Sequence, residues 1–258
     1  MKERSIGFIG GGRVASILLG GWESMGRMPA AVMVCDCDHT ALRKLSANCP
    51  SVTTTGDIGL AAAQDIVFLA VPPLAVKDVI TEIKPHLKAD ALVVSLAPKI
   101  MIAKLSKMFG GYERVMRMIP NAPSIVGKGL NPVCFGPAVD ADDRDAIFHI
   151  LQPLGDCPEV TEEQLEPYAI IAAMGPTYFW PQLYQLKTLA ESFGLSEETA
   201  LAALGKMLHG TVATMKDSGL SPDQVQDLIP AKPMAEEVQA FCEAYEQKLT
   251  GLMEKIRP

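Results

Sequence analysis

The stretch Ser5-Ile6-Gly7-Phe8-Ile9-Gly10-Gly11-Gly12-Arg13-Val14-Ala15 decides the fold of this chain. Its apolar start runs into glycines, which is typical of a short buried strand that leads into a tight turn. Gly10, Gly12 and Ala15 fit the pattern G-x-G-x-x-A, and the residues that follow, up to Met25, have helical content. In that pattern the first glycine permits the turn, the second lets a pyrophosphate approach the backbone, and the small third residue lets the helix pack closely on the strand.

The turn therefore predicts a dinucleotide-binding site, because the amides at the start of a helix attract a phosphate group. We expect Gly10, Gly12, Arg13 and Val14 to contact this cofactor. The alternative is a glycine-rich turn in an α/β protein that binds no nucleotide. The order of strand, turn and helix favours the nucleotide.

An acidic residue ends the second predicted strand, which covers residues 31–36. Asp36 lies 24 residues beyond Gly12, near the position where a carboxylate accepts hydrogen bonds from the ribose hydroxyls of NAD. The same charge would repel the 2′-phosphate of NADP, and the nearest arginine, Arg43, lies inside the next helix. The predicted cofactor is NAD or NADP, with NAD favoured. Alternatively, Asp36 only caps the next loop, and Asp38 is the rival acid for the ribose.

Short apolar runs alternate with helical stretches through the first part of the chain. Strands are predicted at residues 5–10, 31–36, 65–71, 91–96, 115–118 and 133–135, and helices at 14–25, 41–47 and 74–83, with Thr40 as the N-cap of the second helix. This alternation predicts a mostly parallel sheet that is covered by helices on both faces. The fold class is therefore α/β, with a Rossmann-type dinucleotide-binding domain over residues 1–158.

The pattern changes near Cys157, and from Glu162 onward the periodicity is helical almost throughout. Ser196 precedes two acidic residues, which is typical of the start of a helix. We place the boundary between 155 and 162, and predict an all-helical C-terminal domain over residues 159–258.

Composition excludes several classes of protein. The chain has 258 residues, 48% of them hydrophobic, and a net charge of −7, so a disordered chain and a nucleic-acid-binding surface are not expected. No apolar stretch is long enough for a membrane span.

The six cysteines show no paired spacing, which favours free thiols and a cytoplasmic location. Cys35, Cys37 and His39 offer no complete zinc ligand set, so no metal site is predicted.

Four segments carry a resemblance to a known family. They are Ile6-Gly7-Phe8-Ile9-Gly10-Gly11-Gly12, Val67-Phe68-Leu69-Ala70-Val71-Pro72-Pro73, Arg117-Met118-Ile119-Pro120-Asn121-Ala122-Pro123 and Gly175-Pro176-Thr177-Tyr178-Phe179. Together they resemble the pyrroline-5-carboxylate reductases over nearly the whole chain. The resemblance implies a Rossmann domain, a helical domain that forms an intertwined homodimer, and reduction of a cyclic imine by a nicotinamide cofactor.

The resemblance also implies roles for particular residues. Ala70, Val71 and Pro72 would contact the cofactor, and Asn121 would be a polar catalytic contact, although it could instead be a turn residue. The substrate would be bound at the start of a helix by Met174, Gly175, Pro176 and Thr177.

The substrate half of the pattern departs from the family. The family's Val-Lys-Pro is Val71-Pro72-Pro73 here, and its Ala-Gly after the fourth predicted strand is Pro98-Lys99. Its loop Ser-Pro-Gly-Gly-x-Thr, which holds the substrate carboxylate, falls on residues 231–236. Lys232 and Glu236 stand in that loop and are predicted as catalytic residues that alter the specificity, because a carboxylate repels a carboxylate whereas a hydroxyl donates to it. The alternative is that the two are an exposed loop pair.

The sequence therefore predicts an NAD(P)-dependent reductase that transfers hydride to the C=N bond of a small cyclic imine. One alternative is a non-catalytic sensor that binds a dinucleotide. The other is a hydroxy-acid dehydrogenase of similar architecture, for which Lys187 is the candidate general acid or base.

Overall fold

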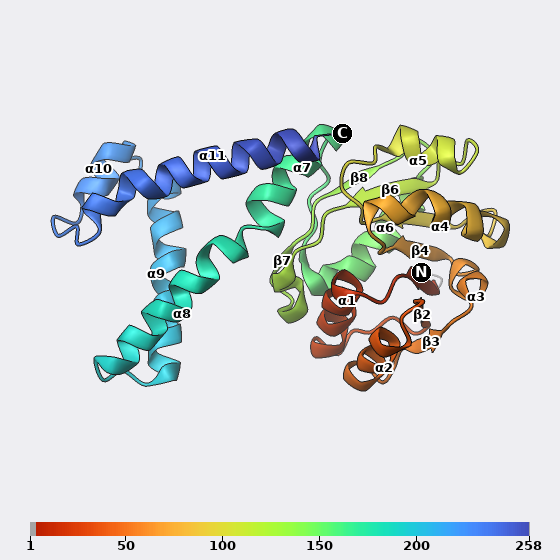
Figure 1. The fold of residues 1–258 in the computed structure, drawn as a ribbon, viewed down its shortest axis with the longest axis horizontal. Helices are drawn as coiled ribbons and strands as arrows, with labels where there is room; N and C mark the ends of the chain where they lie inside the picture. The colour runs from red at the N-terminus through yellow and green to blue at the C-terminus, as the bar shows by residue number, and fades with distance from the viewer. Residues whose placement is uncertain (1–3, 258) are drawn as a thin grey trace. The chain divides into compact units, whose positions relative to one another are not determined.

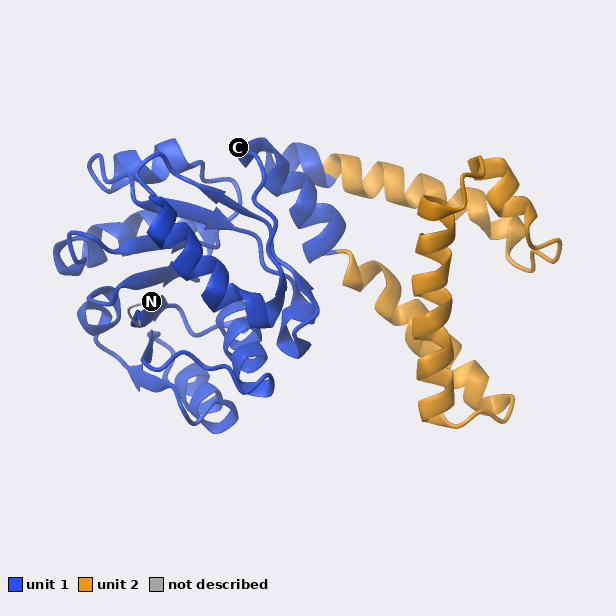
Figure 2. Cartoon of the chain, turned by 180° about the vertical axis from the view of Figure 1, so that it is seen from behind, with its two compact units in different colours: residues 1–174, 252–258 blue, residues 175–251 orange. Residues whose placement is uncertain are grey.

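The computed structural model describes residues 4–257 of the chain. The chain divides into two compact units, Met1–Met174 with Leu252–Pro258 and Gly175–Gly251, which Figure 2 shows in two colours. We call them unit 1 and unit 2. The last strand of unit 1 ends at Asp156, close to the expected boundary at 158, but the helical segment from 162 to 174 belongs to unit 1.

Unit 1 is built on a seven-stranded sheet in the order β3-β2-β1-β4-β5-β6-β8 (Figure 1). The strands are β1 (Ile6–Ile9), β2 (Val32–Cys35), β3 (Thr53–Thr55), β4 (Ile66–Leu69), β5 (Leu92–Ser95), β6 (Val115–Met118) and β8 (Val133–Phe135). All neighbours pair in parallel except β6 and β8, which are antiparallel. A second, two-stranded sheet joins β7 (Gly129–Leu130) to β9 (Gly155–Asp156).

Helices cover both faces of this sheet, as the sequence predicted. One buried cluster joins one sheet face to α1 (Arg13–Ser24), α2 (His39–Asn48) and α6 (Ala141–Leu151). The other cluster joins the opposite face to α3 (Ile58–Ala62), α4 (Val76–Ile83) and α5 (Ile102–Met108). Because the central strands β1 and β4 are buried on both sides, they are continuous apolar runs and not alternating ones.

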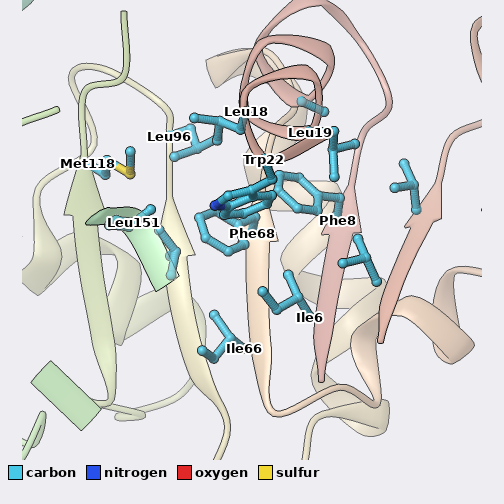
Figure 3. Close-up of a cluster of buried hydrophobic side chains, with 14 of the residues drawn as sticks. Ile6, Phe8, Leu18, Leu19, Trp22, Ile66, Phe68, Leu96, Met118 and Leu151 are labelled. Atoms are coloured by element: carbon cyan, nitrogen blue, oxygen red, sulfur yellow. The ribbon is translucent and has the colours of Figure 1, made fainter. Parts of the chain in front are cut away.

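Three aromatic side chains form the centre of the first cluster (Figure 3). The rings of Phe8 and Phe68, on the adjacent strands β1 and β4, stack with centroids 4.6 Å apart. Trp22 of α1 packs edge-on against both rings and is fully buried. Its indole N–H donates to the carbonyl of Ile150 at 2.8 Å, so its one polar atom is satisfied inside the core. These contacts fix α1, and with it the glycine turn, on the sheet.

Unit 2 consists of helices. They are α8 (Pro176–Ser192), α9 (Glu197–Asp217), α10 (Pro222–Asp227) and most of α11 (Val238–Ile256). The predicted start at Ser196 is confirmed, since its hydroxyl accepts the N–H of Thr199. The rings of Tyr178 and Tyr245 join α8 to α11 with centroids 6.0 Å apart. Ala200 is the one buried hydrophobic residue between positions 175 and 251.

The predicted fold class is confirmed, and two local predictions are wrong. Strand β3 is missing from the prediction because its three threonines carry no apolar run and it pairs on one side only. The N-cap of α2 is Asp38 and not Thr40, because the Asp38 carboxylate accepts the Thr40 N–H at 2.7 Å. Asp38 is thereby engaged as a cap. Within residues 4–257, no helix is long and apolar enough to cross a membrane.

Candidate active site

The glycine turn lies at the carboxyl edge of the sheet, between β1 and α1. Gly10 has a φ of +106°, and a Cβ on it would stand 2.5 Å from the carbonyl oxygen of Ala70. Only glycine permits this approach of the turn to the segment after β4. At Gly12, in contrast, a Cβ would meet no atom within 4 Å, so that side of the turn faces open space. The turn is therefore packed tightly on the protein side and open on the other.

The amino end of α1 is available for an anion. Gly12 is its N-cap, no side chain caps the helix, and its first turn holds no acidic residue. By comparison, carboxylates cap α2, α3 and α6 through Asp38, Asp57 and Asp140. The uncapped N–H groups of a helix start form a ready anion site. Arg13 and Val14 are exposed in this first turn, and Ala15 is fully buried against the sheet. The open space at Gly12 and the free amides fit a dinucleotide pyrophosphate.

Asp36 stands directly beside this turn. Its Oδ2 accepts the N–H of Gly11 at 2.7 Å, and its Oδ1 accepts the N–H of Asp38 at 2.8 Å. The carboxylate thus holds both the glycine turn and the loop after β2. The second contact is the loop-capping role that the sequence left open as an alternative. Each oxygen can accept a second hydrogen bond. Asp36 can therefore shape the turn and still accept ribose hydroxyls.

The segment after β4 completes the predicted cofactor edge. The N–H of Ala70 donates to Ile9 at 2.8 Å, which holds the segment beside β1. Val71 is half-buried and Pro72 is exposed. The chain adds β2 and β3 on one side of β1 and then β4, β5 and β6 on the other side. The carboxyl edge at β1 and β4 is therefore the switch point where open α/β sheets bind their ligands. The structure thus brings all the predicted cofactor residues to one edge: Gly10, Gly12, Arg13, Val14, Asp36, Ala70, Val71 and Pro72.

Asn121, the predicted catalytic amide, is 8% exposed and already engaged. Its Oδ1 accepts the N–H of Leu130 at 3.0 Å, and its Nδ2 donates to the carbonyl of Ala172 at 3.3 Å. Ala172 belongs to a π-helical turn, Ala169–Ala173, and such turns occur often at functional sites. The amide therefore fixes the segment that leads to the candidate substrate residues. A positioning role fits this geometry better than direct contact with substrate.

A buried ionic cluster lies at the same edge and was not predicted. Arg117 of β6 is fully buried and pairs with Glu166 and, at 3.1 Å, with Glu162. Glu166 Oε1 also accepts the N–H of Lys99 at 3.1 Å, and Glu162 Oε1 accepts that of Ile102 at 2.6 Å. Arg117 stands in the segment that carries the family resemblance, but no local pattern reveals partners that lie 45 and 49 residues away.

The other predicted site residues lie at or beyond the end of unit 1. Met174 ends unit 1, and Gly175, Pro176 and Thr177 begin unit 2, with Pro176 as the first residue of α8 as predicted. Lys232 and Glu236 are exposed in unit 2, where the carbonyl of Lys232 accepts the N–H of Ala235 in the turn before α11.

The structure also shows the surroundings of Lys187, the candidate general acid or base, and of the cysteines. Lys187 pairs with Glu197 at 3.1 Å and Glu191 at 3.2 Å. The hydrogen bonds to these two carboxylates raise its pKa, which makes it a poorer proton donor and weakens the hydroxy-acid alternative. Burial raises the pKa values of Cys35 and Cys157 to about 11, so both thiols are unreactive. In the part of the chain that the structure describes, no three His, Cys, Asp or Glu side chains gather as a metal site.

Comparisons with known proteins agree with this geometry. The family model described as "NADP oxidoreductase coenzyme F420-dependent" matches residues 5–99. A pyrroline-5-carboxylate reductase of Corynebacterium melassecola is 27% identical over 250 residues, covering 96% of this chain and 92% of that protein. One from Pseudomonas aeruginosa is 28% identical and covers 88% and 83%.

Solved structures give the same result. A pyrroline-5-carboxylate reductase of Coxiella burnetii superposes with a TM-score of 0.69 at 28% identity, over 99% of this chain and 95% of that one. The predicted resemblance to the pyrroline-5-carboxylate reductases is confirmed. The Plasmodium falciparum pyrroline carboxylate reductase with NADP bound shares the fold, with a TM-score of 0.76 at 21% identity over 99% and 96% of the two chains.

Proposed function

We propose that this protein is an NAD(P)-dependent reductase that transfers hydride to the C=N bond of a small cyclic imine. The observation that carries the proposal is the open, uncapped glycine turn at the switch point of the sheet. The pyrroline-5-carboxylate reductases that the chain resembles over nearly its full length support the reaction class. Overall, the imine and NAD(P)H, with one proton, give the amine and NAD(P)⁺.

In this mechanism the chain binds and orients. A bound nicotinamide supplies the hydride, and the protein contributes position and electrostatics. The amides of α1 and the open face of Gly12 hold the pyrophosphate, and Asp36 holds the adenosine ribose. The segment Ala70 to Pro72 supports the other half of the cofactor. Many cyclic imines already carry their proton near neutral pH, so the site needs no strong acid of its own.

Asp36 supports NAD as the preferred cofactor. Its carboxylate already accepts two backbone N–H groups, from Gly11 and Asp38, and so is held beside the turn. A fixed negative charge beside the ribose repels a 2′-phosphate.

We also propose a homodimer that forms through unit 2. Of the twenty-five large hydrophobic side chains that are exposed in the described chain, eighteen lie in unit 2, which has one buried hydrophobic residue. Three long helices with almost no core of their own need an apolar partner. A second copy of the same helices supplies one, because a two-fold interface pairs like surfaces.

A cytoplasmic location completes the proposal. All six cysteines are free, including the exposed Cys37 and Cys242. Thiols of this kind persist in a reducing compartment.

The direct test is a panel of cyclic imines assayed with NADH and NADPH, and with the corresponding amines and NAD⁺ at high pH. The proposal expects reduction of at least one imine and oxidation of its amine. Tight cofactor binding without turnover of any imine would instead support the dinucleotide sensor. Reduction of keto acids alone would support the dehydrogenase alternative.

A further inference from the structure

Lys99 lies in the loop between β5 and α5, at the carboxyl edge of the sheet. Strands β4 and β5 are neighbours, with Leu69 opposite Ser95, so this loop lies beside the predicted cofactor segment after β4. The N–H of Leu96 donates to Leu69 at 3.1 Å and continues the pairing past the end of β5. The lysine is therefore placed on the edge where the hydride acceptor must bind, given the cofactor site above.

The backbone of Lys99 is in a conformation that lysine avoids. Its φ is +69°, and no other non-glycine residue in the described chain has a positive φ. This left-handed conformation costs of order 1 kcal/mol or more for a residue with a Cβ. Such strain persists only where the surroundings fix it, and it gathers at functional sites.

The surroundings do fix it, through the buried ionic cluster. Glu166, which is 1% exposed, accepts the Lys99 N–H, and Glu162 accepts the N–H of Ile102 three residues later. Between them, the sulfur of Met101 lies 3.8 Å from a guanidinium nitrogen of Arg117. The loop is thus tied at three points to Arg117 and its two carboxylates. Its shape, and the position from which the lysine side chain extends, are set in advance.

The side chain itself has no such partner. It is exposed, and its ammonium makes no ion pair or hydrogen bond with any residue from 4 to 257. The neighbouring loop carries Pro72 and Pro73 and supplies no cation. A pre-positioned, unpaired ammonium at a substrate edge is suited to an anionic group of the substrate.

We propose that Lys99 is a substrate-binding residue of this chain, whose ammonium pairs with the anionic substituent of the imine. This inference rests on the proposed function. The sign of the effect distinguishes it from a general contact. An uncharged ring becomes a cation when its imine is protonated, so the Lys99 ammonium repels that substrate or leaves it unaffected. A ring with a carboxylate gains an attraction that a neutral side chain cannot replace.

The test compares two substrates in three variants. Lys99→Met removes the charge but retains an unbranched side chain, Lys99→Arg keeps the charge, and Lys104→Met removes an exposed lysine from the following helix. KM and kcat are measured for 1-pyrroline and for pyrroline-5-carboxylate, and NADH binding is titrated in parallel. Lys99→Met should raise KM for the carboxylate roughly tenfold to a hundredfold and leave or lower KM for 1-pyrroline. Lys99→Arg should restore most of the loss, and Lys104→Met should change neither KM.

Equal changes in KM for both imines, or no change, would overturn the role of Lys99. Weaker NADH binding in Lys99→Met would also overturn it, because the lysine would then serve the cofactor. If the wild-type protein reduces no imine of the panel although it binds NADH, the proposed function itself fails. If it reduces other imines but not pyrroline-5-carboxylate, the role of Lys99 fails alone.

Discussion

The two units of this chain differ in how much of their apolar side-chain surface they bury. Unit 1 buries its strands between two layers of helices, and side chains such as Phe8, Trp22 and Phe68 are fully inside. Unit 2 has three long helices and leaves side chains such as Phe193 and Val212 exposed to 80% and 63%. Unit 1 thus carries a complete core and the edge that is predicted to bind the cofactor. Unit 2 has one buried hydrophobic residue of its own, and the proposed dimer would cover its exposed apolar side chains.

The largest effect is expected in the core of unit 1. Phe68→Ala removes one ring of the aromatic cluster and leaves a cavity beside Phe8 and Trp22, which should lower the free energy of unfolding by about 3–5 kcal/mol. Denaturant titration measures it. Phe193→Ala in unit 2, where the ring is 80% exposed, is the matched control and should cost far less in the isolated protomer. Equal losses would contradict the comparison of the two units.

The next effect concerns self-association through unit 2. Val212→Glu places a charge on an exposed apolar surface of α9, and a two-fold interface would contain that charge twice. Self-association should weaken by roughly a hundredfold or more, measured by sedimentation, because an unpaired charge is costly to bury. NADH binding should remain.

Leu60→Glu in α3 of unit 1 is the control, since Leu60 is 51% exposed outside the helical unit. It should leave the association state unchanged. A wild-type protein that stays monomeric at all concentrations would refute the dimer.

The same contrast between the units explains which parts of the fold could be predicted from the sequence. Strands such as β4 lie within their predicted ranges, because a parallel strand that is buried on both faces is a short apolar run. Strand β3 is missed because it is polar and lies at the sheet edge. The hydrogen bond from the Lys99 N–H to Glu166 is missed because the two residues are 67 positions apart. Helical periodicity predicts the helices of unit 2, but it does not indicate which molecule covers their apolar faces.

The choice of cofactor should change by a smaller amount. Asp36→Ser removes the charge that repels a 2′-phosphate but retains a hydroxyl for the Gly11 N–H. The ratio of NADPH to NADH affinity should rise about tenfold, as fluorescence titration of both cofactors would show. An unchanged ratio would mean that Asp36 serves only as a loop cap, the role that its bonds to Gly11 and Asp38 also allow.

The smallest effect is electrostatic and lies at the start of β4. Burial alone would raise the pKa of Asp65, but hydrogen bonds from Lys88 and Ser5 outweigh it and lower the pKa from 3.8 to about 2. A lowered folded-state pKa means that the stabilisation is present above pH 3.8 and is lost as the pH falls toward 2. The stability difference between wild type and Asp65→Asn should therefore be constant near neutrality and shrink below pH 4. A difference that grows on acidification would have the wrong sign.

The most direct test of the central claim is a titration of NADH and NADPH into the wild-type protein and Gly12→Val. A Cβ at Gly12 meets no protein atom within 4 Å, so the variant should unfold like the wild type, yet its side chain fills the open face of the turn. The account predicts saturable binding to the wild type and a loss of roughly a hundredfold or more in the variant. Folded wild-type protein that binds neither cofactor, or a variant that binds as well as the wild type, would contradict it.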